Sequence, residues 1–336
     1  MIADRSPPAL EWGEPATDSL LPNPLQRLRE RLQHLDVTIA VSRAVRIRVI
    51  ENPGMWMPPN EIARVLEAMR DLVRRGIGQD LDYGVLSGDP ERLRRAVVTL
   101  LHDRKDGRLV AFNALSYMDL QLRGRPATAL HLGLVMVDPG YRAKGLSWVL
   151  YGLTCVVIFF RRGLRPLWIS NVTQVPSIIG KVAEVFVTAY PNPFYPVRRS
   201  FDHLCVAREI MHKHRGVFGV GVDAVLDEER LVIANAYTGG SDNLKKTFEN
   251  APKHRDERAN ALCREQLDYV RGDDFLQLAR LDMPSARRYL LREVPRRSLP
   301  ALLYNLAFVL CVQVVLPLLY WLNPRQDMGD LRARAR

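Results

Sequence analysis

The chain has 336 residues, of which 47% are hydrophobic and 25% charged, a composition that excludes a wholly disordered or low-complexity protein. Lysine and arginine (48) outnumber aspartate and glutamate (37) and leave a net charge of +11, which favours an anionic partner: nucleic acid, a membrane surface or a phosphorylated cofactor. The four cysteines lie far apart without a C-x-x-C pair, which excludes a small disulfide-bonded secreted module and indicates a reducing compartment.

The first 40 residues are expected to form a proline-rich leader and a short charged helix over 25–35. They contain no apolar segment of the kind found in secretory signals, so the main body of the protein is expected in the cytoplasm. Residues 44–53 (AVRIRVIENP) then alternate apolar and polar side chains, which predicts a half-buried strand. Apolar residues at helical spacing follow from Asn60 to a stop at Gly76.

Strands and helices continue to alternate up to about residue 205. The patterns predict strands over 109–117, 129–137 and 165–172, and helices over 146–160 and 178–190. This order indicates an α/β or α+β fold with a mixed central sheet flanked by helices, which we assign to a domain over 41–205. The helix over 146–160 (LSWVLYGLTCVVIFF) is almost entirely apolar, so it is buried against the sheet, lines a groove for a long acyl chain or touches the bilayer.

The junction ALHLGLVMVDPGYRAKGLS, residues 129–147, is the most informative segment. A strand runs directly into a turn at 138–140, and a helix is predicted to begin shortly afterwards. Gly145 lets the backbone approach a ligand closely, and the first N–H groups of a helix attract anions. Arg142 and Lys144 add positive side chains. The segment therefore predicts a binding site for a pyrophosphate.

The same residues resemble the signature of the GNAT acyltransferase superfamily. Val137-x-Pro139 and Arg142-x-x-Gly145-x-Ser147 match its pattern at every position except the last, where serine replaces glycine or alanine. The resemblance covers about residues 44–205 and implies a GNAT-like fold, with acyl-CoA or an acyl carrier protein as co-substrate and no tightly bound cofactor. It implies a co-substrate site formed by Val135, Met136, Val137, Arg142, Ala143, Lys144, Gly145, Leu146, Ser147 and Asn171. No P-loop motif and no dinucleotide-binding glycine motif is present.

The resemblance also suggests where the catalytic groups lie. The family's base commonly lies on the strand before the phosphate loop, where His131 is the titratable residue. Its acid is often a tyrosine seven residues after an asparagine that ends the next strand; Asn171 fits, but position 178 is isoleucine. Tyr190 is the predicted substitute and Tyr195 is an alternative, and proton transfer through water also remains open.

Residues 206–297 form an extension with no counterpart in the motif. The segments 217–225 and 230–237 predict a hairpin, and a charged helical part follows from Arg255. The extension could be a lid, an acceptor site or a connector. Its start contains His212 and His214, which would lie on different faces of a helix, so no metal site is expected there.

Residues 298–324 (SLPALLYNLAFVLCVQVVLPLLYWLNP) contain no charged residue. An apolar helix of about 24 residues is about 36 Å long, enough for a hydrocarbon core of about 30 Å. Arginines and aromatic residues lie at its two ends: Arg296, Arg297, Tyr320, Trp321 and Arg325. The segment predicts a single transmembrane helix, followed by a basic tail over 325–336; a buried core helix or a hairpin bent at Pro317 are the alternatives.

Together these features predict a membrane-anchored N-acyltransferase. It would transfer an acyl group from acyl-CoA or acyl carrier protein to an amine of a lipid, such as a sphingoid base or an amino-acid lipid, as in the GNAT-like lipid acyltransferases that it resembles. The alternative is a non-catalytic acyl-CoA sensor that acts on a membrane partner. Nucleic acid is not expected as a partner, because no recognition motif accompanies the positive charge.

Overall fold

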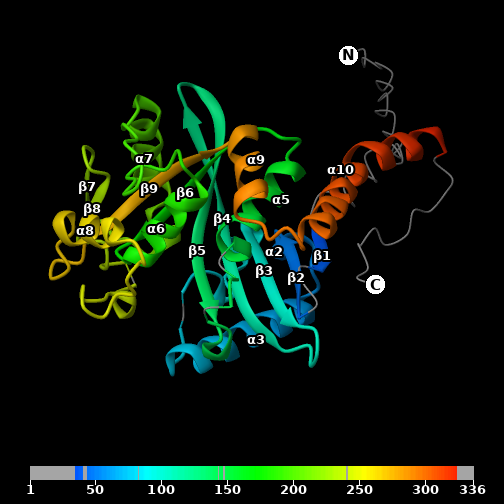
Figure 1. Ribbon diagram of the computed structural model, residues 1–336, viewed down its shortest axis with the longest axis horizontal. Coiled ribbons are helices and arrows are strands. Elements are labelled where there is room, and N and C mark those ends of the chain that lie inside the picture. Colours follow the sequence, from blue (N-terminus) through cyan, green and yellow to red (C-terminus); the bar gives the residue numbers. More distant parts are fainter. Residues whose placement is uncertain are drawn as a thin grey trace, which may run out of the picture.

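The structure is a computed structural model that describes residues 35–40, 44–81, 83–142, 144–146, 148–239 and 241–323 (Figure 1). Their strands form one nine-stranded sheet in the order β1-β2-β3-β4-β5-β6-β9-β8-β7. The strands are β1 (Asp36–Ala40), β2 (Val45–Glu51), β3 (Ala96–Asp103), β4 (Leu109–Leu122), β5 (Arg125–Val137), β6 (Leu167–Thr173), β7 (Val225–Asp227), β8 (Val232–Ala234) and β9 (Asp274–Leu281). Only β5 and β6 are parallel neighbours within this sheet, and the remaining described ladders are antiparallel.

Helices cover both faces of the sheet, which confirms the predicted mixed sheet flanked by helices (Figure 1). The α-helices are α2 (Pro53–Trp56), α3 (Pro59–Ile77), α4 (Pro90–Arg94), α5 (Thr154–Arg161), α6 (Pro176–Val185), α7 (Phe201–Lys213), α8 (Glu257–Gln266), α9 (Met283–Arg292) and α10 (Leu299–Leu322). Short 3₁₀ turns are η1 (Gly84–Ser87), η2 (Pro139–Tyr141), η4 (Arg215–Phe218) and η5 (Asp242–Leu244), and η3 (Val149–Leu153) is a π-helix.

Strand alternation divides the core between the two faces. Neighbouring residues of β3 separate accordingly, since Leu100 packs with α3 and Leu101 packs with α5. Next to the α3 cluster on its face, α7 and η4 form a further cluster against β6 and β9. On the opposite face η3 and α5 are buried against the sheet, and Val156 and Val157 are both 0% exposed. The helix predicted over 146–160 is therefore a core helix.

Most of the predicted elements are present with shifted ends. The strands expected over 44–53, 109–117, 129–137 and 165–172 are β2, β4, β5 and β6, and the helix from Asn60 to Gly76 is α3. The helix expected over 178–190 is wrong at its end, because α6 stops at Val185 and Tyr190 instead forms a bridge to Leu278 of β9. Strand β3, for which no prediction was made, is buried on both faces and so lacks the polar alternation of a half-buried strand.

The extension beyond residue 205 belongs to the main sheet. A hairpin is present as β7 and β8, which are only three residues each. The first strand predicted over 217–225 is wrong, because the segment starts in η4 and β7 begins only at Val225. The predicted charged helical part is two helices, α8 and α9, separated by β9, which pairs with β6 over seven residues. The division of the chain at residue 205 stays a prediction, but a single sheet runs across it.

Helix α10 forms where the apolar segment predicts a helix. Leu302 and Leu306, each 2% exposed, pack against the core, and the helix contacts α5 and β1. Its other end projects away from the sheet (Figure 1). Within the described residues, none of the helices has the combined length and apolar character that crossing a membrane requires, so the transmembrane helix predicted over 298–324 is not found. The predicted leader, its short helix up to residue 34 and the predicted basic tail lie outside the described residues. The end of the segment assigned to the leader is wrong, because 36–40 form β1 of the sheet.

Candidate active site

The parallel strands β5 and β6 part halfway along their length. They pair over four residues each, 129–132 with 168–171. Beyond this point β5 continues to Val137 and pairs only with β4 on its other side. Among the described residues, the outer edge of 133–137 therefore has no strand partner. Its backbone N–H and C=O groups can hydrogen-bond to an extended ligand, as an added strand would.

A bulge in β5 marks the point of parting. The register between β4 and β5 shifts between Asn113 and Leu115, which pair with Val135 and Leu132. A Cβ atom on Gly133 would lie 2.5 Å from the carbonyl oxygen of Ala114, so only glycine allows this close approach. Bulges bend the strand that carries them, which accounts for the divergence of β5 from β6 directly beyond it.

The predicted co-substrate residues of β5 lie along this open edge. Val135 and Val137 are half-buried on the face covered by η3 and α5. Met136 is buried on the opposite face against α3, where a Cβ on Gly76 would lie 2.9 Å from its sulfur. The three side chains are thus fixed by packing, which leaves the backbone edge as the part that can bind a ligand.

The loop after β5 is held in shape by the Asp138 carboxylate. Its Oδ1 accepts a hydrogen bond of 2.9 Å from the Gly140 N–H, which forms the turn that leads into η2. Its Oδ2 is paired with Arg75 of α3, and Arg108 lies 3.6 Å away. Asp138 therefore acts as a turn former that ties the loop to α3.

Two positive side chains of the loop extend to solvent. Arg142 and Lys144 are exposed, and no acid lies within ion-pair distance of either among the described residues. Arg142 donates to the Gly76 carbonyl oxygen at 3.4 Å, and the Lys144 ammonium lies 3.9 Å from the centre of the Tyr141 ring. Gly145 has a φ of 70°, and no atom lies within 4 Å of where its Cβ would be. A ligand can therefore approach the backbone closely there. The predicted contacts of Ala143 and Ser147 lie outside the described residues.

The helix that follows the loop starts with a wide turn. Leu146, half-buried, accepts backbone hydrogen bonds from Val149 and Leu150 at 3.1 and 3.2 Å. Within the π-helix η3, the Leu150 carbonyl oxygen accepts a hydrogen bond of 2.5 Å from the side-chain amide of Asn113. The Asn113 Oδ1 atom is buried with no partner among the described residues. The predicted arrangement of strand, basic loop and helix start is thus present.

A buried polar cluster lies at the end of β6, on the other face of the sheet. Asp274 is 5% exposed, and burial raises the pKa of its carboxyl group to about 7. The Tyr237 hydroxyl lies 3.0 Å from Asp274 Oδ1 and 2.8 Å from the side-chain amide of Gln174. Burial and the Asp274 carboxylate together raise the pKa of Tyr83 to about 12. At neutral pH this cluster holds one carboxyl group that is close to half ionised.

The cluster and His131 share one face of the sheet. Phe275 pairs with Thr173, so Asp274 lies beside the end of β6, where that strand has parted from β5. Side chains alternate along β9, and Asp274 therefore points to the same face as the β9 leucines that pack with Phe218. The His131 ring lies 5.1 Å from the Phe218 ring. Candidate proton-transfer groups thus flank the parted strands on this face.

His131 is buried in the last paired stretch of β5 and β6. Its Nδ1 lies 3.0 Å from the Ser170 hydroxyl, and the residue is 2% exposed. Burial lowers the pKa of its imidazole to about 4, so the ring is neutral at physiological pH. The assignment of His131 as the general base stays a prediction.

The structure separates His131 from Tyr190. Tyr190 lies beyond the outer edge of β9, bridged to Leu278, which is aligned with Ser170 and His131 across the sheet. Three strand spacings of about 4.8 Å place the two backbones about 14 Å apart. The Tyr190 hydroxyl donates to the carbonyl oxygen of Glu229. The two predicted catalytic side chains are therefore not brought together.

The other residues singled out on β6 and after it point elsewhere. Asn171 is buried on the α6 face, where its amide lies 3.3 Å from the Gln277 side chain. Tyr195 is 42% exposed and contacts Arg288 of α9. Ile178 is half-buried, so the position of the expected tyrosine carries no acid.

Sequence reasoning missed Asp274, Tyr237, Gln174 and Tyr83. They come from four segments that are distant in the chain, and only the pairing of β9 with β6 brings them together. The available signal is the sequence DDFLQLARL over 273–281, in which two carboxylates directly precede a strand-length apolar run. If this segment is predicted as a strand, a carboxylate is expected at the end of that strand.

The comparisons with known proteins give partial likenesses. No family model matches the sequence, and no curated protein matches it. A GNAT family N-acetyltransferase of Escherichia coli, solved with CoA, is similar over 42% of this chain and 68% of that chain, at 17% identity and a TM-score of 0.31. A ribosomal-protein-S5-alanine acetyltransferase of Vibrio fischeri is similar over 40% and 74%, at 15% identity and a TM-score of 0.28. A Trypanosoma brucei acetyltransferase is similar over 33% and 72%, at 26% identity and a TM-score of 0.24.

Proposed function

We propose that the protein is an N-acyltransferase that uses acyl-CoA, or an acyl carrier protein, as acyl donor. The observation that carries this proposal is the parting of β5 from β6 above a basic loop and a helix start. An open strand edge suits the amide-rich pantetheine arm, and the loop suits the phosphates. One continuous ligand with both features is a coenzyme A thioester.

The chain's own groups would hold this donor in two places. The backbone of 133–137 would hydrogen-bond to the pantetheine amides. Arg142, Lys144 and the N–H groups around Gly145 would bind the pyrophosphate. The thioester carbon would then lie where the two strands part, beside the face that carries both His131 and Asp274.

The chemistry needs one proton acceptor and one proton donor. The amine nitrogen of the acceptor attacks the thioester carbon, the C–S bond breaks, and CoA leaves as a thiolate. We assign the ionised Asp274 carboxylate, directly or through a water, to take the proton from the amine, because its pKa of about 7 suits a base at neutral pH. The thiolate then takes up a proton from water, because burial and the neighbouring Asp274 carboxylate raise the pKa of the Tyr237 hydroxyl well above its usual value and make it a poor acid.

We further propose that the acceptor is an amine carried by a lipid, on the cytoplasmic side of a membrane. Support comes from α10, whose outer turns expose Leu318 (56%), Trp321 (62%) and Leu322 (65%). An exposed apolar surface of this kind, with exposed Arg296 and Arg297 before the helix, suits contact with anionic lipid. Sphingoid bases and amino-acid lipids are the acceptors to test first.

The proposal is tested by amine-dependent release of CoA thiol. Purified full-length protein in detergent is incubated with acyl-CoA of several chain lengths and with soluble amines, a sphingoid base or an amino-acid lipid. Arg142→Glu and Gly145→Trp should each abolish release. Arg165→Glu makes the same charge change at an exposed site beyond α5 and should retain full activity. Equal activity of Arg142→Glu and Arg165→Glu would refute the assigned phosphate loop.

The half-buried Ile178, where the resemblance leads one to expect a tyrosine, favours one other function, a non-catalytic acyl-CoA sensor. A sensor would bind CoA and lose binding in Arg142→Glu, but would release no thiol with any of the amines. Thiol release that depends on an amine excludes it.

A further inference from the structure

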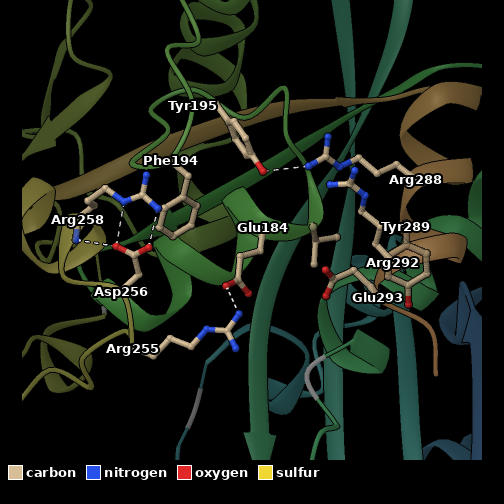
Figure 2. Close-up of a pocket in the computed structure, with 11 residues that line it drawn as sticks. Glu184, Phe194, Tyr195, Arg255, Asp256, Arg258, Arg288, Tyr289, Arg292 and Glu293 are labelled. Atoms are coloured by element: carbon tan, nitrogen blue, oxygen red, sulfur yellow. Dashed lines mark hydrogen bonds and ion pairs between the residues drawn. The ribbon is translucent and has the colours of Figure 1, made fainter.

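A pocket of about 250 Å³ lies between α6, α8 and α9 (Figure 2). Four arginines line it: Arg255, Arg258, Arg288 and Arg292. Two aromatic side chains, Phe194 and Tyr195, form part of its wall. None of these residues belongs to the phosphate loop or to the parted strands. The pocket therefore offers positive charge and aromatic rings at a separate place on the surface.

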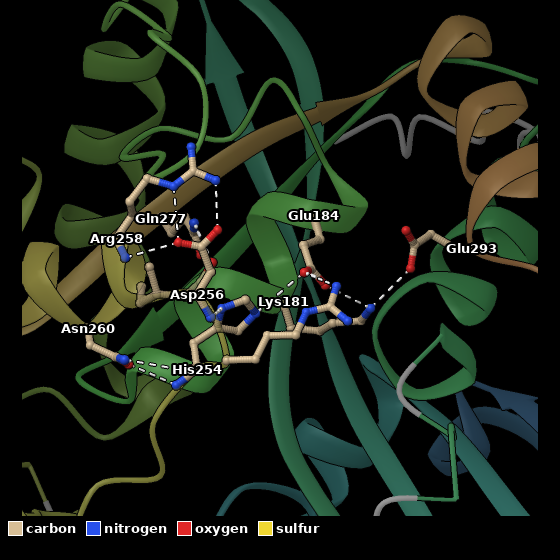
Figure 3. A network of polar contacts seen from close by, with 10 residues as sticks. Lys181, Glu184, His254, Asp256, Arg258, Asn260, Gln277 and Glu293 are labelled. Carbon is tan, nitrogen blue, oxygen red and sulfur yellow. Dashed lines mark hydrogen bonds and ion pairs between the residues drawn. The ribbon is translucent and has the colours of Figure 1, made fainter.

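Two of the three acidic groups in the wall, Glu184 and Glu293, are paired with basic side chains. Glu184 accepts from Lys181 at 3.1 Å and from Arg255 at 2.7 Å, and Lys181 also lies 3.0 Å from Glu293 (Figure 3). Although burial opposes it, the pairing with Lys181 and Arg255 keeps the pKa of Glu184 below its usual value. Glu184 and Glu293 are thus both already paired with basic side chains, so neither is left as an unpaired acid in the wall.

The third acid is paired in the same way, whereas two arginines are not. Asp256 binds Arg258 at 2.7 Å, a contact that lowers the pKa of Asp256 to about 2. Arg288 and Arg292 are one turn apart on α9, and no acid lies within ion-pair distance of either among the described residues. The Arg288 guanidinium instead donates to the Tyr195 hydroxyl at 3.0 Å. The pocket therefore has two uncompensated guanidinium groups, which is the arrangement that binds phosphate.

The pocket is physically connected to the phosphate loop. Tyr289, between the two arginines in sequence, lines it and donates through its hydroxyl to the Trp148 carbonyl oxygen at 2.7 Å. Trp148 begins the helix that follows the loop. The Tyr289 ring lies so close to Gly152 of η3 that a Cβ there would be 2.1 Å from it. The pocket and the loop are thus neighbours on the same face of the sheet.

We propose that Arg288 and Arg292 bind the 3′-phosphate of the donor's adenosine, with Phe194 and Tyr195 beside the adenine base. The inference rests on the proposed function, because it concerns the same acyl-CoA. Aromatic rings stack on bases, and paired guanidinium groups bind a phosphate dianion. A donor whose pyrophosphate lies at the loop would extend its nucleoside toward this pocket. The extension beyond residue 205 would then select CoA over donors without a nucleotide, such as an acyl carrier protein.

The test compares CoA with 3′-dephospho-CoA by calorimetry on the full-length protein. The wild type should bind CoA at least tenfold more tightly. In the double variant Arg288→Ala/Arg292→Ala, affinity for CoA should fall by roughly tenfold while affinity for dephospho-CoA stays unchanged. The single variant Arg292→Ser should show a smaller loss of affinity for CoA. Arg287→Ala removes the same charge from an exposed neighbouring site of α9 outside the pocket wall and should keep the wild-type ratio.

The outcomes separate the two proposals. If the wild type binds CoA and dephospho-CoA equally, or if Arg287→Ala lowers the ratio as much as the pocket variants, the pocket assignment is wrong and the acyltransferase proposal stands. If adenosine 3′,5′-bisphosphate binds through Arg288 and Arg292 without competing with CoA, the pocket is a separate nucleotide site and the assignment is again wrong. If the wild type binds neither form of CoA, the proposed function itself fails.

Discussion

The carboxyl group of Asp274 is the single residue on which the proposed chemistry most depends. It is buried in the interior, and the Tyr237 hydroxyl donates a hydrogen bond to it. His131 has also been buried, but burial has the opposite effect on a base, so its pKa falls to about 4. The two candidates for the general base thus titrate about three pH units apart, and the pH dependence of the rate distinguishes them.

We expect kcat/KM to rise as the pH increases through about 7, because Asp274 must be ionised to accept the proton. Asp274→Asn should lower kcat/KM by about 10²- to 10³-fold and remove this limb of the profile. The measurement is initial-rate thiol release between pH 5 and 9. A wild-type profile that is flat over this range would instead point to His131, which is already neutral throughout.

Loss of activity in Asp274→Asn must be separated from loss of folding, and stability provides the control. The folded pKa of Asp274 lies above its unfolded value near 3.8, so the native state is stabilised by the proton. Wild-type stability contributed by this group is present below about pH 4 and is lost as the pH rises toward 7. The asparagine variant avoids that loss, so its melting temperature at pH 8 should equal or exceed that of the wild type.

At the scale of elements, the bulge in β5 is the feature that opens the sheet. Gly133→Val should be destabilised by about 1–3 kcal/mol, because its Cβ would collide with the Ala114 carbonyl oxygen. It should also weaken CoA binding, since the bend in β5 cannot be kept. Urea denaturation and calorimetry provide the two readouts.

The matched control is Gly216→Ala. This glycine has a negative φ and open space around the position of its Cβ, so both stability and CoA binding should stay close to the wild type. Wild-type CoA binding by Gly133→Val would show that the bulge does not shape the donor site.

The sequence predicted the elements that carry a clear period and the loop that carries a motif. The alternation of β2, the helical spacing of α3 and the junction from Val137 to Gly145 all correspond to observed structure. The sequence predicts β9 as part of a charged helical region, because its neighbours α8 and α9 are rich in charge. The partner of β9 lies about a hundred residues earlier in the chain, so the local sequence contains no signal of that pairing.

The candidate site was predictable only in part for the same reason. The open edge and the loop follow from consecutive residues, so local pattern and a family resemblance located them. The Asp274 cluster draws on segments near residues 83, 174 and 237, and its pKa depends on burial that only the assembled sheet creates. Tyr190 lies away from His131 because α6 ends early and the following chain crosses to β9; its role as the acid stays a prediction.

At the scale of the whole molecule, the positive charge and the outer end of α10 predict adsorption to anionic membranes. We expect the protein to bind vesicles that contain phosphatidylserine and the Trp321 fluorescence to shift to the blue on binding. Leu318→Glu/Leu322→Glu should reduce the bound fraction severalfold in a sedimentation assay. Rising salt should weaken binding as well, because part of the attraction is electrostatic.

The control places acids at exposed apolar positions elsewhere. Val222 and Val270 are 84% and 89% exposed and lie far from α10 in sequence, so Val222→Glu/Val270→Glu should leave vesicle binding unchanged. An equal loss of binding in the two double variants would mean that charge alone, and not the surface of α10, drives adsorption.

The pairing of β9 with β6 also implies a delay during protein synthesis, between the completion of β6 and the arrival of its partner strand. The ribosome completes β6 at Thr173 but reaches Asp274 only about a hundred residues later, which at common elongation rates takes about 5–20 s. During that interval β6 has been synthesised, but the edge that pairs with β9 has no partner strand. The growing polypeptide is thus most exposed to misassembly before its last strand emerges, and slow translation of the extension would lengthen its dependence on chaperones.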